Sequence, residues 1–392
     1  MKKFLDLGIQ PLANSYLKKK DLYKKEKKFN LSAGFDKKNY LVSILRTIPK
    51  EKMFNKDYPY KSSESKTMRN AFKILAVKIK KKFDPKLVVE IGSNDGAFLF
   101  NFDKKKAVGV EPCKNLAKKT KKKKFKTFSQ YWDINLSNKI SKIGKADVIY
   151  SANTLSHIEN LENVFKAINV LLSDNGVLII EDPSLLKCLK NNAYDQFYCE
   201  HIYIFSAIAL NKILSKHGLI IFDIENLNTH GGSNRYYIKR KISKLNKIKH
   251  SVKKEIYKET KYGLKKFDTY KKFAERVRSS RKKLLNIFKE IKSKNKKIIG
   301  YGATAKSCTV LNYCKIDKSY IDFFYDTTSY KINKFLPGSK ILVNKYKKLN
   351  IKVNDYVFLG AWNFKHEIFN KEKKFIKDGG RFITHIPFPK II

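Results

Sequence analysis

A buried-strand pattern that passes directly into a glycine turn sets the strongest limit on how this chain folds. Residues 87–91 (LVVEI) are apolar apart from Glu90, and residues 92–96 (GSNDG) form a turn that leads into a predicted helix. Three further strand-like runs follow, separated by helical or charged segments, at residues 107–111, 147–151 and 176–181. Strands that alternate with helices pair in parallel, because a crossover helix returns the chain to the same edge of the sheet. The predicted fold class is therefore α/β with a parallel sheet.

The same pattern starts again in the last third of the chain. Residues 244–296 are Lys-rich and helical, and the strand-like residues 297–301 then lead into a second glycine turn at residues 302–306 (GATAK). Further strand-like runs lie at residues 320–325, 356–361 and 381–385. We therefore expect a second α/β unit, which agrees with the two or three domains that 392 residues allow.

The first 65 residues follow neither pattern. They are aromatic and irregular, with Pro11, Pro59 and serines at positions 62, 63 and 65. We expect this segment to form a cap on the rest of the molecule and not an independent domain.

The charge of the chain is strongly positive. Its 85 Lys and Arg residues stand against 35 Asp and Glu, which gives a formal net charge of +50. Only eight of the basic residues are Arg, although the guanidinium fork is the group that reads bases and clamps phosphates. Two explanations remain, a coding bias toward Lys on permissive surfaces, which we favour, and a dedicated polyanion site. We expect loose, salt-sensitive binding to nucleic acid and no specific nucleic-acid partner.

Cysteine usage and hydropathy exclude further classes of protein. The five cysteines are odd in number and include no C-x-x-C pair, so a disulfide framework or a zinc ribbon is unsupported. No uncharged apolar run approaches the length of a membrane span, and no cleavable apolar segment follows Met1. We therefore expect a cytoplasmic protein without a membrane partner.

The glycine turn after the first strand is a candidate cofactor site. Gly92 and Gly96 let a ligand approach the backbone and the positive end of a helix. Glu111 ends the next strand, where a carboxylate can accept hydrogen bonds from both hydroxyls of a ribose. The turn lacks the three-glycine dinucleotide pattern, and we expect Asp95 to repel a pyrophosphate. An adenosyl group with a cationic sulfonium is therefore favoured over NAD, and the alternative is that the glycines only close a tight turn.

A dense group of polar side chains lies at residues 194–201 (YDQFYCEH), after the strand at 176–181 and so beyond the carboxyl edge of the sheet. His201 can remove a proton near neutral pH, Tyr198 can donate to a developing oxyanion, and Glu200 can orient or charge the imidazole. A structural histidine packed by tyrosines is the alternative. Cys199 is disfavoured as a nucleophile because no oxyanion loop accompanies it.

Residues 230–235 (HGGSNR) are a candidate for substrate binding. Their glycines create a backbone cavity lined by an imidazole, a hydroxyl and a guanidinium, which suits a phosphate or a sugar. The alternative, a glycine hairpin with a surface arginine, is about equally plausible from this segment alone.

A second candidate for substrate binding is the turn at residues 300–307. It looks like a nucleoside-triphosphate loop, but alanine replaces the glycine before Lys306 and the spacing is wrong, so ATP hydrolysis is excluded. Lys306 at a helix N-terminus can still hold the diphosphate of a nucleotide. Asp326 is a candidate for lining the same crevice.

Eight short segments, taken in order, resemble the bacterial sugar C-methyltransferases, and the resemblance covers nearly the whole chain. The segments are residues 7–14 (LGIQPLAN), 58–63 (YPYKSS), 90–96 (EIGSNDG), 152–158 (ANTLSHI), 198–201 (YCEH), 230–235 (HGGSNR), 300–306 (GYGATAK) and 361–363 (AWN). Any one of them is a weak signal, but eight in register are a strong one.

The resemblance implies a SAM-dependent enzyme that acts on nucleotide-linked 4-keto-deoxysugars, which are made for antibiotics and cell-surface polysaccharides. It implies three parts, with a small N-terminal cap at residues 1–65, a central Rossmann-like class I methyltransferase domain at 66–240 and a C-terminal Rossmann-like nucleotide-sugar domain at 241–392. The implied partner is the nucleotide-sugar substrate, and the sequence does not indicate an oligomeric state.

The resemblance also implies roles for individual residues. His201 is the base that removes the proton beside the keto group, and Tyr198 and Glu200 steady the enolate and the imidazole before the enolate carbon attacks the sulfonium methyl. The implied SAM-binding residues are Glu90, Gly92, Asn94, Gly96, Glu111, Asn153, Tyr58 and Ser62. The implied substrate-binding residues are His230, Gly232, Arg235, Gly302, Lys306 and Asp326.

One departure from the family concerns the cap. The family's cap usually binds zinc through cysteines on both sides of the Leu-Gly-x-Gln-Pro-Leu stretch, whereas this sequence has no cysteine before Cys113. Four thiolate ligands cannot be assembled there. We therefore expect a metal-free cap, and its contacts with substrate stay an open question.

Three rival functions deserve comparison with C-methylation. They are O- or N-methylation of a related sugar, non-catalytic binding of a nucleotide sugar, and methylation of RNA by a basic enzyme. The presence of Tyr198, Glu200 and His201 together disfavours a silent binding protein. Basic runs such as residues 118–124 lack interleaved aromatics and arginines, which disfavours the RNA enzyme.

Overall fold

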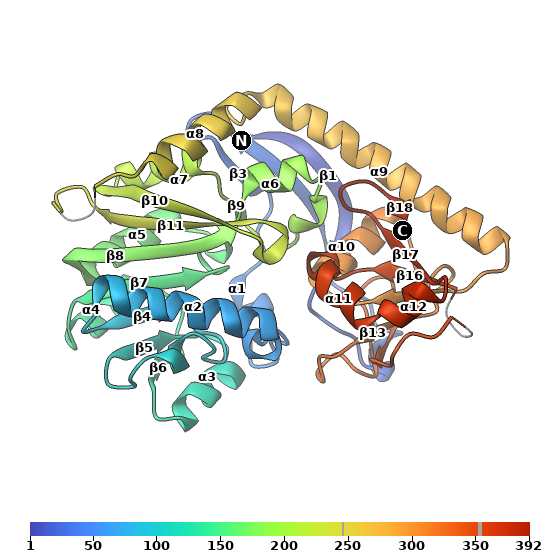
Figure 1. Cartoon of the computed structure of the whole chain (residues 1–392), viewed down its shortest axis with the longest axis horizontal. Coiled ribbons are helices and arrows are strands. Elements are labelled where there is room, and N and C mark those ends of the chain that lie inside the picture. The colour runs from blue at the N-terminus through green and yellow to red at the C-terminus, as the bar shows by residue number, and fades with distance from the viewer. Residues whose placement is uncertain (245–246, 352–354) are drawn as a thin grey trace.

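The computed structural model describes residues 1–244, 247–351 and 355–392. In this part of the chain the strands form three sheets, two large ones side by side and a small one between them (Figure 1). This arrangement confirms the predicted α/β class, with a second α/β unit in the C-terminal part.

The central sheet has the strand order β10-β11-β8-β7-β4-β5-β6. Its strands are β4 (Val88–Ile91), β5 (Ala107–Val110), β6 (Lys126–Phe128), β7 (Ala146–Ala152), β8 (Leu172–Pro183), β10 (Leu219–Leu227) and β11 (Ser233–Arg240). The five strands from β8 to β6 are parallel. The sequence predicts four of them, β4, β5, β7 and β8, and does not predict β6. However, β11 and β10 extend the sheet in the antiparallel sense, because the glycine turn between them is a short hairpin connection that cannot cross over the sheet.

Helices cover both faces of the central sheet. They are α2 (Lys66–Phe83), α3 (Lys114–Lys122), α4 (Ile134–Ser141), α5 (Leu161–Leu171) and α7 (Ala207–Ser215), whereas α6 (Leu185–Lys190) packs into the core formed by the cap and the C-terminal part. The apolar side of α2, including Met68 and Phe72, packs on one face of the sheet, and α4, α5 and α7 pack on the other. Burial on both faces explains why the parallel strands read as continuous apolar runs in the sequence.

The C-terminal sheet has the strand order β14-β15-β13-β12-β16-β17-β18. Its strands are β12 (Ile298–Tyr301), β13 (Phe323–Asp326), β14 (Lys334–Phe335), β15 (Leu342–Lys345), β16 (Tyr356–Leu359), β17 (Arg381–Thr384) and β18 (Lys390–Ile391). The helices that follow β11 are α8 (His250–Tyr262), which packs on β10 and α7 of the central part, and then α9 (Phe267–Ser293), α10 (Ala305–Cys314), α11 (Lys365–Lys371) and α12 (Lys373–Lys377). The long helix α9 runs along the outside of the molecule toward this sheet (Figure 1).

The N-terminal cap contains a regular sheet and is not irregular as we expected. Strands β1 (Lys2–Pro11), β2 (Lys28–Asp36) and β3 (Leu41–Ile44) are antiparallel, and α1 (Lys50–Met53) follows them. The β1–β2 pairing shifts register twice, and the neighbouring residues Phe4 and Leu5 are both buried. These bulges interrupt the two-residue alternation by which a strand is recognised, which is why the sequence pattern looked irregular.

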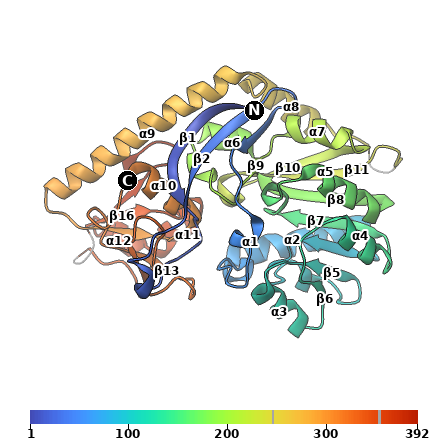
Figure 2. The ribbon, with the colours of Figure 1, turned by 180° about the vertical axis from the view of Figure 1, so that it is seen from behind.

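The fourth strand of this small sheet is β9 (Tyr203–Ile204), which comes from the central part of the chain. Strands β1 and β2 pass between the two large sheets, as the reverse view shows (Figure 2), and β1 packs on α9 and α10. The cap therefore connects the two α/β units. Within the described residues, the structure contains no helix that is long and apolar enough to span a membrane.

Candidate functional site

A large cavity lies where the carboxyl ends of both large sheets meet, which is the usual ligand position in open α/β sheets. Its volume is about 1140 Å³. The residues that follow β4, β5 and β7 line one side, and those that follow β12, β13 and β16 line the other. The predicted site residues that line it are Tyr58, Ser62, Glu90, Gly92, Asn94, Glu111, Asn153, Tyr198, His201, His230, Gly302, Lys306 and Asp326.

The glycine turn after β4 forms the floor of the predicted cofactor site. Gly92 has a φ of 76°, and a Cβ added to it would lie 2.1 Å from Thr154 Oγ1, so only glycine fits here. The side-chain oxygen of Asn94 accepts a hydrogen bond of 2.9 Å from the backbone N–H of Ser62. Gly96 has a φ of 86° and closes the turn against Phe100. Gly96 shapes the turn but does not belong to the described lining of the cavity.

Two buried carboxyl groups stand beside this turn. Glu111 accepts hydrogen bonds of 2.8 Å from the backbone N–H groups of Asn94 and Cys113, and burial raises its pKa. Oε2 of Glu90 is buried and has no hydrogen-bond partner among the described residues. Burial and the neighbouring Glu111 raise the pKa of Glu90 well above its usual value.

These groups fit SAM. An unpaired buried oxygen and a carboxylate that has spare lone pairs require donors or positive charge from a ligand, and SAM carries an ammonium, a sulfonium and ribose hydroxyls.

The predicted role of Asp95 is wrong. Its side chain is buried and accepts a hydrogen bond from the Ser63 N–H at 3.1 Å, and it pairs with Lys119 at 2.9 Å. Asp95 is not part of the described lining of the cavity, so it holds the turn to the segment before α2 and does not face a ligand. The turn's preference for SAM therefore rests on Glu90 and Glu111 and not on repulsion by Asp95.

Tyr198 and His201 form a hydrogen-bonded pair in the cavity wall. Oη of Tyr198 lies 2.7 Å from Nε2 of His201, and Nδ1 of His201 lies 2.8 Å from the carbonyl oxygen of Gln196. A carbonyl oxygen only accepts, so Nδ1 carries the proton and Nε2 accepts the Tyr198 hydroxyl. Burial, followed by the charges of His157 and Lys306, holds the pKa of His201 well below its usual value. The imidazole is therefore neutral with its basic nitrogen on Tyr198.

Glu200 points away from this pair and toward the cap. Its carboxylate accepts hydrogen bonds from Asn14 at 2.6 Å and Tyr58 at 2.8 Å, and it lines a second cavity of about 380 Å³. Burial raises its pKa to about 7. The structure thus brings Glu200 to Tyr58, a predicted cofactor residue, and not to the His201 imidazole.

His157 is a residue of the site that the sequence analysis missed. Its ring stacks on His201 with centroids 5.2 Å apart and on Phe54 at 5.5 Å. It lines the cavity, and its Nε2 is buried without a partner among the described residues. Burial lowers its pKa to about 4. The motif that contains it was visible in the sequence, but only the fold shows that this histidine reaches His201.

The C-terminal wall of the cavity is built on the second glycine turn. Gly302 has a φ of 85°, and a Cβ on it would lie 2.3 Å from that of Ala361. Asp326 accepts hydrogen bonds from the N–H groups of Ala303 at 2.9 Å and Thr328 at 2.8 Å, and it pairs with Lys331 at 3.3 Å. Asp326 therefore stabilises the shape of the turn, and part of its side chain lines the cavity.

The segment at 230–235 divides between two places. His230 lines the cavity, and burial and the Lys306 charge lower its pKa to about 3. Arg235 is buried in the central sheet, where it pairs with Glu181 at 2.9 Å and Glu225 at 3.0 Å. Gly232 packs on Lys187. The described lining of the cavity includes neither Gly232 nor Arg235.

The five cysteines are all buried and unpaired with one another. Burial raises the pKa of Cys199 far above its usual value, so this thiol is not an activated nucleophile.

Comparisons with known proteins show which families this chain resembles. Residues 64–222 match a family described as "Methyltransferase domain", residues 228–387 match "C-methyltransferase C-terminal domain", and residues 1–54 match a family whose description names a zinc binding domain. C-methyltransferase NovU of Streptomyces niveus is 30% identical over 395 residues, which covers 99% of this chain and 93% of that protein.

Solved structures resemble the chain more distantly. A SAM-dependent methyltransferase of Clostridium acetobutylicum ATCC 824 is 16% identical, with a TM-score of 0.35 over 44% of this chain and 92% of its own. Magnesium protoporphyrin IX methyltransferase of Synechocystis PCC 6803, with bound SAH, is 15% identical, with a TM-score of 0.34 over 44% and 82%. These scores are too low to support conclusions about the site.

The residues of the cap do not fit the zinc ion that the matching family implies. No cysteine precedes Cys113, and the described residues include no group of three or more His, Cys, Asp or Glu that could hold a metal. Hydrogen-bonded pairing of β1, β2, β3 and β9 connects the cap to the central part instead.

We expect a chelator to leave the melting temperature of this protein unchanged, because the cap lacks the cysteine thiolates that would hold a structural zinc. Thermal unfolding with and without EDTA, together with elemental analysis of the purified protein, measures this. About one zinc per chain that survives mild chelation, or a lower melting temperature after its removal, would contradict it.

Proposed function

Because this chain belongs to the sugar C-methyltransferase family and is a SAM-dependent methyltransferase, we propose that its substrate is a nucleotide-linked 4-keto-deoxysugar, methylated on the carbon beside the keto group. Transfer to carbon requires a base, because a sugar carbon is not a nucleophile until the neighbouring carbonyl takes up its charge. The chain supplies that base within the cavity that both sheets share.

The observation that carries this proposal is the 2.7 Å contact between Oη of Tyr198 and Nε2 of His201. A neutral imidazole can accept a proton on Nε2, and the Tyr198 hydroxyl already donates to that nitrogen. The Tyr198 oxygen takes the proton from the substrate and at the same time passes its own hydroxyl proton to Nε2 of His201. His201 is therefore the base that finally accepts a proton. The electron pair of the broken C–H bond moves onto the keto oxygen, which becomes an enolate.

Residues at the glycine turn are proposed to hold the cofactor. Glu90 and Glu111 accept from its donors, Gly92 and Asn94 provide the backbone surface, and Asn153, Tyr58 and Ser62 complete the enclosure, while Gly96 closes the turn behind it. When bound, SAM supplies an electrophilic methyl group to the carbanionic carbon. Tyr58 also donates to Glu200, so Glu200 is proposed to position the cofactor side of the cavity.

Residues of the opposite wall are proposed to hold the nucleotide sugar. Lys306 and His230 line the cavity, and the ammonium of Lys306 suits a diphosphate. Gly302 and Asp326 shape the turn that carries Lys306. Gly232 and Arg235 support the loop of His230 from behind. The division into a cap at 1–65, a SAM domain at 66–240 and a C-terminal domain at 241–392 remains part of this proposal.

Incubation of the enzyme with SAM and a series of nucleotide-linked 4-keto-6-deoxysugars tests the proposed substrate class. We expect one product that is heavier by one methylene, with the new methyl attached to a carbon beside the keto group by NMR. Boiled enzyme is one control, because it cannot catalyse the reaction. The matching 4-hydroxy sugar is the other, because it has no keto group and cannot form the enolate. A methyl group on oxygen or nitrogen, or no product with any 4-keto sugar, would contradict the proposal.

A further inference from the structure

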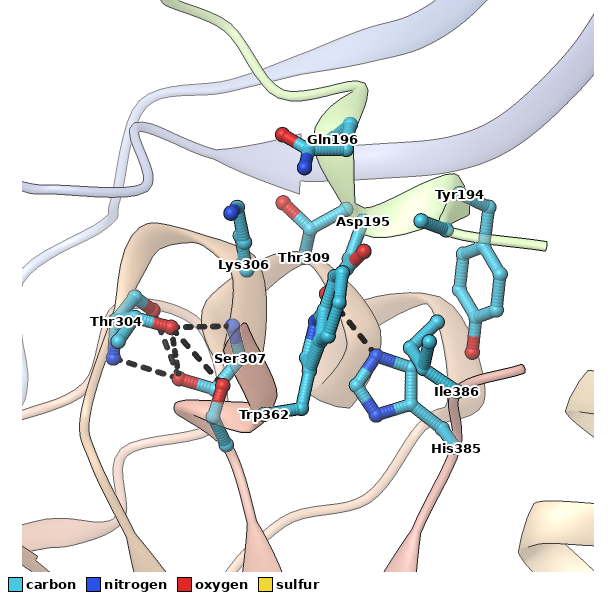
Figure 3. A network of polar contacts seen from close by, with 12 residues as sticks. Tyr194, Asp195, Gln196, Thr304, Lys306, Ser307, Thr309, Trp362, His385 and Ile386 are labelled. Atoms are coloured by element: carbon cyan, nitrogen blue, oxygen red, sulfur yellow. Dashed lines mark hydrogen bonds and ion pairs between the residues drawn. The ribbon is translucent and has the colours of Figure 1, made fainter. Parts of the chain in front are cut away.

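Asp195 is a buried acid that the proposed mechanism does not use. It lies in the short 3-10 helix η5 (Tyr194–Gln196), three residues before Tyr198, and it is fully buried. Its Oδ2 accepts a hydrogen bond of 2.6 Å from Nε1 of Trp362 and lies 3.0 Å from Nε2 of His385 (Figure 3). Both partners come from the C-terminal part of the chain, so this carboxylate joins the segment of the base to the opposite wall of the cavity.

The surroundings of Asp195 favour its charged form. Burial by itself raises a carboxyl pKa, but the charge and hydrogen bond of His385, the charge of Lys306 and the hydrogen bond of Trp362 together hold the pKa of Asp195 below its usual value. An ionised carboxylate without compensating groups is strongly disfavoured in a protein interior. The negative charge behind the cavity wall is therefore matched by specific partners at Oδ2, whereas the buried Oδ1 has no hydrogen-bond partner among the described residues.

Lys306 stands on the cavity side of the same network. Its ammonium lies 5.4 Å from the centroid of the Trp362 ring and donates a long hydrogen bond of 3.5 Å to the carbonyl oxygen of His230. An ammonium has three donors, so at least two remain for a ligand in the cavity. Burial lowers the pKa of Lys306, and the negative charge of Asp195 opposes that shift.

The residue after Asp195 strengthens the link. Nε2 of Gln196 donates a hydrogen bond of 2.7 Å to the same His230 carbonyl oxygen that Lys306 contacts. Gly231, next to His230, has a φ of 86°, and a Cβ on it would lie 2.2 Å from Trp362. The Trp362 ring, the His230 loop and Lys306 are thus packed around one carboxylate.

We propose that Asp195 is a positioning residue whose carboxylate holds Trp362 in place and keeps Lys306 cationic and directed at the cavity, where it binds the diphosphate of the substrate. The inference rests on the proposed function, because it takes the nucleotide-sugar diphosphate as the anion that completes the coordination of Lys306. It adds that Asp195 supplies the negative charge that supports this binding. Asp195 belongs to the same segment of the chain as Tyr198 and His201.

The test compares the binding of nucleoside diphosphates with that of the matching nucleosides, which are uridine, thymidine and guanosine, in calorimetry at saturating SAH. The ratio of the two affinities reports the diphosphate contribution, and general damage to the fold would weaken both ligands alike. We expect Asp195→Asn to reduce this ratio on the order of tenfold, because the charge is lost while the shape is kept. Lys306→Met should reduce it at least as much, and the double variant should equal Lys306→Met.

Glu259→Gln is the matched control. This carboxyl group is also buried, and it accepts backbone N–H groups of Ala207 and Ile208 at 2.8 and 2.9 Å, away from the cavity. We expect it to lower the melting temperature without changing the affinity ratio. If Asp195→Asn does not fold, Trp362→Phe, which removes the Nε1 donor and keeps a ring, is expected to reduce the ratio in the same direction.

The possible failures are distinguishable. If Lys306→Met lowers the ratio while Asp195→Asn and Trp362→Phe do not, or if the effects of Asp195 and Lys306 are additive, the role of Asp195 is overturned and the proposed substrate class stands. If the wild type does not prefer any nucleoside diphosphate over its nucleoside, the proposed substrate class fails, and this inference fails with it.

Discussion

His201→Asn is expected to lower both methyl transfer and proton exchange by about 10²- to 10⁴-fold, while SAM affinity stays nearly constant. Asparagine keeps a hydrogen-bonding group beside Tyr198 but has no basic nitrogen. The exchange reaction isolates the first step, because with SAH in place of SAM no methyl can move. In heavy water, the wild type should then exchange the proton beside the keto group of a nucleotide-linked 4-keto sugar, and the variant should not. NMR measures exchange, and calorimetry with SAH measures the cofactor site.

The control for this variant is His250→Asn, because His250 is an exposed histidine at the start of α8. It should exchange and methylate at the wild-type rate. Wild-type exchange and methylation by His201→Asn would mean that His201 is a structural histidine, and the base would then be sought in Tyr198 or Glu200.

Glu111→Ala is expected to weaken the binding of SAM or SAH by about 10- to 100-fold, since hydrogen bonds to a charged group contribute roughly 1.5–3 kcal/mol. Wild-type binding should lie in the micromolar range, on the order of 8 kcal/mol. The variant removes the carboxylate that is proposed to accept from the ribose and that also accepts from the Asn94 N–H at 2.8 Å. Calorimetry gives the affinity directly.

Glu225→Ala is the control for the Glu111 variant. Its carboxylate also belongs to the central sheet and pairs with Arg235 at 3.0 Å, but it is outside the described lining of the cavity. It should leave cofactor affinity unchanged, even if it lowers the melting temperature. Unchanged affinity in Glu111→Ala would show that the ribose assignment is wrong.

The cofactor side of the site could be predicted because its signals are local. A buried strand, a glycine turn and an acid at the end of the next strand place Gly92 and Glu111 at one sheet edge in any parallel α/β fold. The structure places both at the cavity, with Glu90 and Asn94 beside them. The partners of the Arg235 and Glu200 side chains could not be predicted in this way. A charged residue within a motif does not indicate which buried group it will contact.

The structure of the cap and the contact between the two walls of the cavity could not be predicted. Both depend on contacts between segments that are far apart in the sequence. Bulges in β1 interrupt the two-residue alternation of buried and exposed side chains. Strand β9 pairs with the cap sheet although it lies far along the chain. Asp195 meets His385 only because the segment that follows β8 and the end of β17 come together in the folded chain.

The sequence by itself thus determined the α/β class, the positions of most parallel strands and the residues of the glycine turns. These follow from short-range patterns of burial and backbone conformation, which a few consecutive residues specify. Only the tertiary structure decided that Tyr198 occupies the basic nitrogen of His201, that His157 stacks on this ring, and that Asp195 meets Trp362 and His385. The physical reason is that hydrogen bonds and charge interactions act over a few ångströms in space, and distance along the chain does not predict which groups come that close.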